Sequence, residues 1–379
     1  MDATATARIA RAFEQMPDPR RHNVRHKLFD ILTIALLAVV SGCNDWVEVA
    51  LYARCKIAWL RTFLDLPNGI PSHDTFGRVF VRLNPEAFEA CFRDWMAAMV
   101  ELSGGKLVSI DGKSIRRSFE RGWDKSGMAH MVSAFVTANH MVFAQEKTDG
   151  KGHELDAVEK LLTVLDLTGA VVTIDALGCN TNIARKIRDA DADYVLQVKK
   201  NQPTLLAKMA VAMEDARLDG FAGLAGDSFA QTQKGHGRIE TRKVWVCWNA
   251  ALLLGALAKD WPDLRSLIMV ERRRDVDGKV STERAYYISS LDGRRTARQL
   301  AGYIRGHWGI ENNLHWQLDV SFREDERRLR KGHGAENFSR LCRLALNLLK
   351  QETSEKAGIA AKRHRCGWDN DYLLKVVLA

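Results

Sequence analysis

The chain has 379 residues, with 56 Lys and Arg against 47 Asp and Glu, which gives a net charge of +9. This length allows two or three domains, and a hydrophobic share of 46% excludes a chain that is disordered throughout. The basic balance favours a polyanionic partner such as nucleic acid or an anionic membrane, although many basic proteins bind neither.

No segment is long enough to cross a bilayer. The most apolar run, Ile31–Val40, is far shorter than the ~20 residues that a span needs, so we expect a buried helix. The sequence starts without the charged and apolar pattern of a signal peptide, and its seven cysteines form no Cys-x-x-Cys pair. These features predict a cytoplasmic protein with reduced thiols and no membrane contact.

Residues 1–104 are predicted to form a helical domain that could bind DNA. Ser72 or Asp74 is expected to cap a short helix around Phe76–Val81. The longer segments with helical composition are Leu28–Val40, Trp46–Leu64 and Pro85–Leu102.

From residue 105 the pattern changes to short apolar strands. The expected order is strand, strand, strand, helix, strand, helix, strand, at 107–111, 130–137, 141–147, 154–165, 170–175, 183–190 and 194–198. By analogy, this order predicts an α/β fold of the ribonuclease-H-like class, a mixed sheet with helices on both faces. Residues 105–200 would form the first part of this core.

The rest of the chain is expected to interrupt the core and then complete it. Residues 201–284 are predicted to be an α/β insertion, rich in strands around 238–248 and 266–272. Residues 285–351 would supply the last strand and several helices of the core. Residues 352–379 would form a C-terminal tail.

Two aspartates follow apolar strands in the predicted core. Asp111 is followed by Gly-Lys-Ser, and Asp175 by Ala-Leu-Gly. Ligands gather at the C-terminal ends of parallel strands, and a divalent cation would relieve the repulsion between two close carboxylates. The alternative is that each Asp only caps the turn after it. Two such residues in this order of elements favour the metal site.

Glu311 is the third candidate carboxylate. On a helix it would share a face with His307, Trp308, His315 and Leu318, among apolar and imidazole groups. The alternatives are a Glu paired with a neighbouring Arg or His, and histidines that only pack. The two histidines would lie about 12 Å apart along a helix, too far to bind one zinc ion.

Three carboxylates suit hard cations that prefer oxygen ligands, so we expect magnesium or manganese. Two such ions would support in-line phosphoryl displacement.

The sequence resembles the DDE-type insertion-sequence transposases, and within them the ISAs-type group of H-repeat-associated proteins. Each shared motif is weak alone, but together and in order they are specific. The motifs are Pro17-Asp18-Pro19-Arg20, Pro71-Ser72-His73-Asp74-Thr75-Phe76, Ile110-Asp111-Gly112-Lys113, Thr173-Ile174-Asp175-Ala176, His236-Gly237-Arg238, His307-Trp308-Gly309-Ile310-Glu311-Asn312 and Leu318-Asp319-Val320-Ser321-Phe322-Arg323.

This resemblance implies catalytic Asp111, Asp175 and Glu311, with a β-rich insertion before the Glu. Ile304, His307 and Leu318 replace the Tyr, Arg and Lys of the signature that relatives carry around this Glu. Trp308 matches a Trp that lies near the DNA end in relatives and could stack on a displaced base. The alternative for Trp308 is a core aromatic.

Several side chains are candidates for contacts with DNA. Lys113 would point the same way as Asp111 in an extended strand and could hold a phosphate beside the metals. The alternative for each basic run is a solvated face that binds no partner, which is the usual role of such runs. The candidates are Lys113, Arg20, Arg21, Arg25, Lys27, His307, Trp308 and Arg323, with a further basic run at Arg272–Arg274.

Together these observations predict a transposase that nicks DNA at element ends and transfers the 3′-hydroxyl end into target DNA. We expect two metal ions per site and a homodimer on the DNA. Two alternatives stay open: a nuclease of the same fold without strand transfer, and a transposase-derived DNA-binding protein that has lost catalysis.

Overall fold

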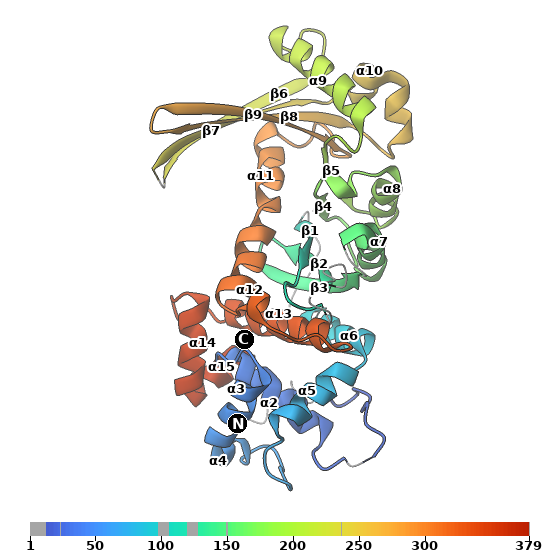
Figure 1. Cartoon of the computed structure of the whole chain (residues 1–379). Coiled ribbons are helices and arrows are strands. Elements are labelled where there is room, and N and C mark those ends of the chain that lie inside the picture. The colour runs from blue at the N-terminus through green and yellow to red at the C-terminus, as the bar shows by residue number, and fades with distance from the viewer. Residues whose placement is uncertain are drawn as a thin grey trace.

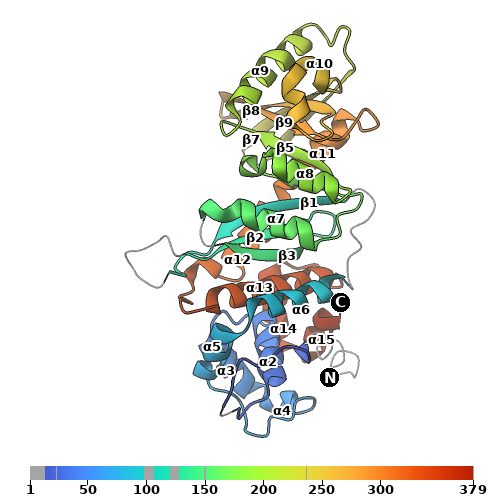
Figure 2. The same ribbon diagram turned by 90° about the vertical axis from the view of Figure 1, so that its right-hand side faces the viewer.

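The computed structural model describes residues 13–22, 24–97, 106–119, 128–148, 151–235 and 237–378. His236, part of one of the motifs above, lies outside these residues, as do parts of the predicted N-terminal domain. The molecule is elongated: helices from both ends of the chain gather at one end, and a long β-ribbon lies at the other (Figures 1 and 2).

The N-terminal helices surround one buried helix. In α2 (Leu28–Val40), twelve side chains are buried, which confirms the predicted buried helix. Ser72, not Asp74, caps α5 by accepting a hydrogen bond from the Thr75 amide. The segment 46–64, which was expected to be helical, contains two helices separated at Lys56 and ending at Leu60. The elements here are α3 (Trp46–Cys55), α4 (Ile57–Leu60), α5 (His73–Arg82) and α6 (Pro85–Ala97).

The expected order of strands and helices after residue 105 is confirmed. Strands β1 and β4 pair in parallel, β4 and β5 pair in parallel, and β1, β2 and β3 pair antiparallel. The elements are β1 (Leu107–Ser114), β2 (His130–Val136), β3 (Met141–Thr148), α7 (Glu154–Val164), β4 (Val171–Ile174), α8 (Thr181–Asp189) and β5 (Asp193–Val198).

Residues 201–284, predicted as an α/β insertion, contain helices and strands, and their strands continue the same sheet. Strand β9 pairs antiparallel with β5, and the full order is β3-β2-β1-β4-β5-β9-β8-β7-β6. Beyond the core, β6 to β9 extend as the long ribbon of Figure 1. The elements are α9 (Pro203–Leu218), β6 (Gly226–Gly235), β7 (Arg238–Cys247), α10 (Ala250–Leu254), β8 (Ser266–Val276) and β9 (Lys279–Ser289).

Helices cover both faces of the sheet, as predicted for this mixed α/β class. Helix α11 (Ala297–His307) crosses β1, β4, β6 and β7 on one face, while α7, α8 and α9 lie on the other (Figures 1 and 2). Leu300 and Ile304 of α11 pack on Val171 and Val195 of the sheet. The face of α11 that does not meet the core strands lies under the ribbon.

The last helices pack beside the first ones. Helix α13 (Gly334–Gln351) contacts α2, α5 and α6 on one side and β3 on the other. The segment predicted as a C-terminal tail contains α14 (Ile359–Trp368) and α15 (Asn370–Leu378), whose apolar residues join the same core. None of the helices described is long and apolar enough to cross a membrane.

Candidate active site

The strand register places Asp111 and Asp175 side by side. Ile110 of β1 pairs with Ile174 of β4 as the last parallel pair, and each is followed by an aspartate: Asp111 within β1 and Asp175 just after the end of β4. Both line one small cavity, together with Glu154. Asp111 does not end its strand as expected, because β1 continues to Ser114 along β2. What ends at Asp111 is the parallel pairing, and this opens the edge where the carboxylates meet.

The glycine after Asp111 is required by close packing. A Cβ at Gly112 would lie 2.3 Å from Nε2 of His130 and 3.1 Å from Oε1 of Glu154. Nε2 of His130 and Oε1 of Glu154 themselves lie 2.5 Å apart. The Asp-Gly step of β1 therefore lets a third carboxylate, Glu154 at the start of α7, approach the two aspartates.

Asp111 carries an unfavourable charge in this setting. Burial raises its pKa from an ordinary 3.8 to about 7, and the Asp175 and Glu154 carboxylates contribute to the rise. Glu311 also raises it, whereas a hydrogen bond from the Gly112 amide opposes the change. Asp175 accepts a hydrogen bond from the Leu177 amide at 3.0 Å. Asp175 therefore does cap the turn after it, whereas Asp111 lies inside β1 and caps no turn, and the two form a cluster of like charge.

Glu311 begins a π-helical turn, η5 (Glu311–His315), between α11 and α12 (Trp316–Val320). The i→i+5 pattern of a π-turn changes which residues share a face. His315 points inward, with Nδ1 3.6 Å from Oδ2 of Asp111, while Glu311 and Trp308 are exposed. The prediction that Glu311 shares a helix face with His315 is therefore wrong. Within the described residues, its side chain has no ion pair or hydrogen bond.

The two histidines beside Glu311 are uncharged at neutral pH. Burial lowers the pKa of His307 to about 4 and that of His315 to about 3. His307 Nδ1 lies 3.1 Å from Oγ1 of Thr173 on β4, so it holds α11 to the sheet. A neutral, half-buried His307 cannot supply the positive charge that an Arg at this position would carry.

The three predicted catalytic residues therefore converge only in part. Asp111 and Asp175 are neighbours, and Glu311 lies within electrostatic range of Asp111. Among the residues described, no group of three His, Cys, Asp or Glu side chains is close enough to hold an ion.

Lys113 does not occupy the expected place. Its side chain is buried, and its ammonium pairs with Asp319 at 2.7 Å and Asp325 at 3.2 Å. Oε2 of Glu324 lies 3.5 Å from the same ammonium nitrogen. The ammonium donates a hydrogen bond to Asp325, and its charge is balanced by three carboxylates of the protein itself. The structure assigns Lys113 to protein contacts instead.

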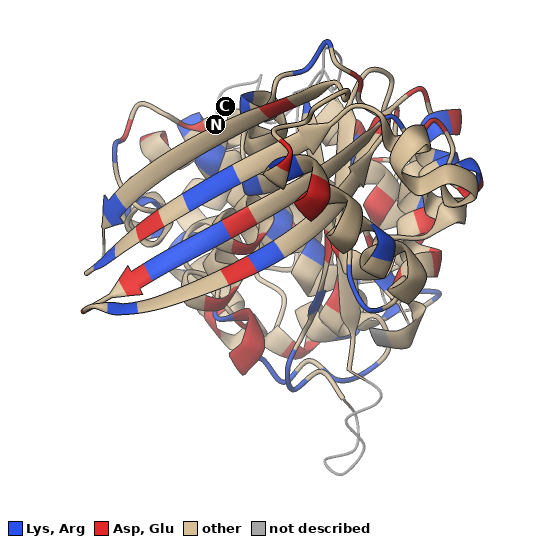
Figure 3. Ribbon diagram, turned by 90° about the horizontal axis from the view of Figure 1, so that it is seen from above, with Lys and Arg blue, Asp and Glu red and all other residues tan. Residues whose placement is uncertain are grey.

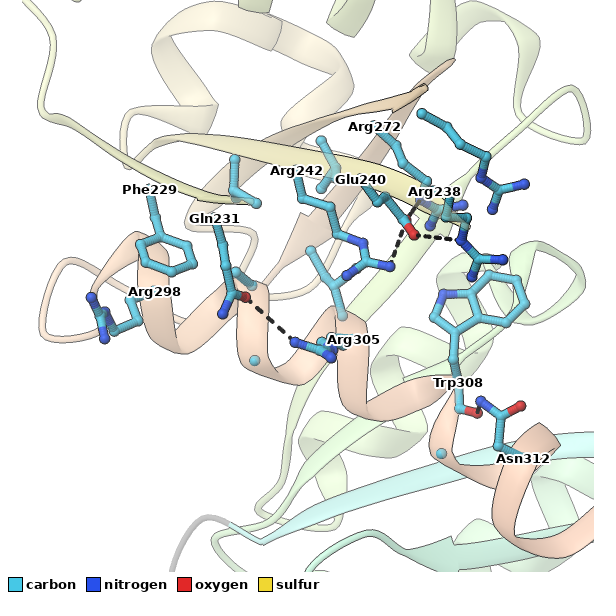
Figure 4. A pocket seen from close by; sticks show the side chains of 17 residues that line it. Phe229, Gln231, Arg238, Glu240, Arg242, Arg272, Arg298, Arg305, Trp308 and Asn312 are labelled. Carbon is cyan, nitrogen blue, oxygen red and sulfur yellow. Dashed lines mark hydrogen bonds and ion pairs between the residues drawn. The ribbon is translucent and has the colours of Figure 1, made fainter. Parts of the chain in front are cut away.

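A basic cleft lies between the β-ribbon and α11 (Figure 4). It has a volume of about 590 Å³. The buried carboxylate of Glu240 is paired with Arg242 at 2.5 Å and Arg272 at 3.6 Å. It is the one acidic residue among the described residues that line the cleft. The lining arginines are Arg238, Arg242, Arg272, Arg274, Arg298 and Arg305.

The cleft is crowded with positive charge. Burial lowers the pKa of Arg242, and the guanidinium groups of Arg272 and Arg305 lower it further. Trp308 lines the end of the cleft next to the π-turn and is 41% exposed, so it is not a core aromatic. Figure 3 shows Lys and Arg along the ribbon strands, with the longest run on β8.

The other basic candidates lie at the opposite end of the molecule or pair locally. Arg20 pairs with Asp18 at 2.7 Å, and Lys27 pairs with Asp65. Arg323 pairs with Glu326. Arg21 and Arg25 are exposed.

Sequence reasoning missed Glu154, the cleft as a unit and the partners of Lys113. The run Arg272–Arg274 was a signal for the cleft, but alternation along a strand sends only alternate arginines to one face. Arg272 and Arg274 line the cleft, and Arg273 does not. Glu154 carried no signal, because its place depends on how α7 packs across the sheet.

Comparison with known proteins identifies relatives along nearly the whole chain. Residues 10–96 match a family described as DDE_Tnp_1-associated, and residues 102–348 match the Transposase DDE domain. "Putative transposase YncI" of Escherichia coli O157:H7 is 39% identical over 96% of this chain and 92% of its own length. "H repeat-associated putative transposase YhhI" of Escherichia coli K12 is 36% identical over 96% and 95%.

Two further matches are shorter or more distant. "Inactive transposase YbfQ" of Escherichia coli K12 is 41% identical over 17% of this chain and 76% of its own length. A solved structure of the piggyBac transposase synaptic complex with hairpin DNA covers 97% of this chain and 76% of its own, with a TM-score of 0.46 at 10% identity. The domain match and the near full-length relatives show that this chain belongs to the DDE-domain transposase family and resembles its H repeat-associated members.

Proposed function

We propose that this chain cuts DNA at the ends of an insertion element and joins the 3′ ends to target DNA, with Asp111, Asp175 and Glu311 as its catalytic carboxylates. The observation that carries the proposal is the adjacency of Asp111 and Asp175 at the end of the β1–β4 pairing. In this proposal β1 to β5 form a ribonuclease-H-like core, and α11 carries the third carboxylate to its open edge.

Asp111 and Asp175 have the oxygen donors and the excess negative charge that suit a divalent cation. A carboxylate whose pKa is raised to about 7 by burial and by its acidic neighbours gains when a cation replaces the proton. Asp111 and Asp175 would hold magnesium or manganese, and the unpaired Glu311 would complete the set. Bound there, two such ions would activate the attacking oxygen and stabilise the leaving oxygen in phosphoryl displacement.

The protein's own side chains orient this edge. The His130–Glu154 pair occupies the space beside Gly112, where a Cβ would meet both side chains. His307 anchors the Glu-bearing helix to Thr173, two residues before Asp175. The same helix lines the arginine cleft, so a DNA strand held there would enter beside Glu311.

The proposal includes DNA as partner and a homodimer as the active form. The arginine cleft supports the first of these, because six guanidinium groups face one carboxylate and match a phosphodiester backbone. Arg21 and Arg25 are proposed as additional contacts to duplex DNA.

The test compares Asp111→Asn with Asp166→Asn, an exposed aspartate on the loop after α7. Labelled element ends and a target plasmid are incubated with magnesium, manganese, calcium or EDTA. The wild type should cleave and join with magnesium or manganese, whereas calcium, with its looser coordination, should support binding and little chemistry. Asp111→Asn should bind DNA as well as the wild type and lose both cleavage and joining, and Asp166→Asn should retain them.

Other outcomes separate the alternatives. Cleavage without joining by the wild type indicates a nuclease. Binding without either reaction indicates a non-catalytic descendant. Cleavage in EDTA, or full joining by Asp111→Asn, refutes the proposed site.

A further inference from the structure

An ion pair, buried on its lysine side, connects the strand that carries Asp111 to the helix that follows the π-turn of Glu311. Lys113 lies two residues after Asp111 on β1, and its side chain is 8% exposed. Its Nζ atom is 2.7 Å from Oδ1 of Asp319 on α12. The two partners come from segments more than 200 residues apart in the chain, so this contact is a direct tether across the candidate site.

Asp319, the partner of Lys113 on the helical side, is connected directly to Glu311 through continuous helical backbone. The π-turn that begins at Glu311 runs into α12 without a break, and Asp319 lies in the last turn of α12. A helix of this length is stiff, and eight residues span about 12 Å. Fixing Asp319 against β1 therefore fixes the distance and angle at which Glu311 approaches Asp111.

The tether is anchored in the protein interior. Glu324, which is fully buried, lies 3.5 Å from Nζ of Lys113 and accepts hydrogen bonds from Ser339 at 2.7 Å and Arg343 at 3.1 Å. Arg343, also fully buried, lies 3.3 Å from Oγ of Ser133 on β2. The network thus joins β1, β2, α12 and α13 around one point.

Stability alone does not explain such a network. Desolvation of buried charges cancels much of their attraction, and apolar side chains of similar volume often stabilise a fold as well or better. Charged pairs do impose direction and register, which an apolar contact does not. A site that needs carboxylates from two separate segments requires this kind of register.

We propose that Lys113 is a positioning residue, which sets Glu311 relative to Asp111 and Asp175 through its contacts with Asp319 and Glu324. This inference rests on the proposed function, because it assumes that these carboxylates share a metal. Lys113 itself touches neither DNA nor metal in this proposal.

The test measures Mn²⁺ binding to the full-length protein by calorimetry, without DNA, alongside cleavage kinetics and thermal unfolding. Lys113→Met removes the charge and keeps the length of the side chain. Its Mn²⁺ affinity should fall about tenfold or more, and kcat should fall while KM for DNA stays within twofold. Lys113→Arg should restore part of the Mn²⁺ affinity. Asp319→Asn, on the partly exposed helix side, should weaken Mn²⁺ binding in the same direction and is expected to fold.

The matched control is Arg340→Met. Arg340 is a buried cation on α13 that pairs with Glu89 at 2.9 Å and Glu336 at 3.1 Å, on contacts that do not include the candidate carboxylates. The Arg340→Met variant should unfold at a lower temperature and keep the Mn²⁺ affinity of the wild type.

The outcomes separate this inference from the proposed function. If Lys113→Met and Asp319→Asn lose only stability, as the control does, and bind Mn²⁺ like the wild type, the inference is overturned. If Asp111→Asn also leaves Mn²⁺ binding unchanged, the proposed metal site fails, and the inference falls with it. Reduced Mn²⁺ affinity in both tether variants, with an unchanged control, supports the positioning role.

Discussion

Replacing Asp111 with Asn should stabilise the metal-free protein at alkaline pH. Because the pKa of Asp111 is raised in the folded state, the folded protein holds this proton more tightly than the unfolded chain does. The carboxylate therefore penalises folding progressively as the pH rises from about 4 to about 7, and the full penalty applies above pH 7. Asn has nearly the same shape and carries no charge, so it removes the penalty.

The size of the gain in stability follows from the change in the pKa of Asp111 on folding. A rise from 3.8 to about 7 is about 3 pKa units, and each unit corresponds to about 1.36 kcal/mol, which gives about 4 kcal/mol as an upper bound. The side chain of Asp111 is 30% exposed, so solvent screening reduces this value. We expect a gain of about 2 kcal/mol in the free energy of unfolding at pH 8.

The assay is urea unfolding in EDTA at pH 8 and at pH 4.5. The gain of Asp111→Asn over the wild type should be present in full at pH 8 and fall to about half at pH 4.5, where the carboxyl group of the unfolded chain is still largely ionised. Adding Mn²⁺ at pH 8 should reduce or reverse the difference, because binding to the folded state stabilises only a protein that retains the site. A gain of equal size at both pH values, or no gain at pH 8, would refute the electrostatic account of this cluster.

Two further predictions concern the site and the cleft. Gly112→Ala should impair cleavage and destabilise the fold, because its Cβ meets His130 and Glu154; wild-type activity and melting temperature would show that the neighbours can move aside. Arg305→Ala should lower the slope of log affinity against log salt for DNA binding by about 1, the value for one lost phosphate contact. Arg294→Ala, which removes an exposed arginine that does not line the cleft, should leave the slope unchanged.

Local patterns in the sequence predicted much of the core. The apolar run of α2 and the alternation of helices and strands from 107 to 198 depend on neighbouring residues, and both were found. Strand β6 was missed because Gly226–Gly235 is mostly polar and exposed, and it is a strand only because β7 pairs with it. The continuation of the sheet through β9 is likewise a long-range pairing that no local pattern encodes.

The candidate site likewise combines features that local sequence patterns predict with features that depend on long-range contacts. The aspartates could be predicted because each follows an apolar strand, and their adjacency follows from parallel pairing. The exposure of Glu311 could not be predicted, because helical periodicity does not reveal a π-turn. The partners of Lys113 could not be predicted either. Asp325 is 212 residues away, and a Lys two residues after an Asp on a strand is compatible with a phosphate contact or an ion pair.

The distribution of charge explains how the fold can keep an unfavourable cluster at its proposed site. Asp111 is disfavoured by its neighbours, yet two residues further along β1, Lys113 meets carboxylates that hold it in place. The β1–β4 pairing fixes the aspartates through backbone hydrogen bonds, which repulsion between side chains cannot break without opening the sheet. Violations of local stability rules concentrate at functional sites, and the surrounding structure compensates for them. The repulsion therefore remains at the open edge of the sheet, where a cation can relieve it, while the paired charges around Lys113 hold the backbone behind it.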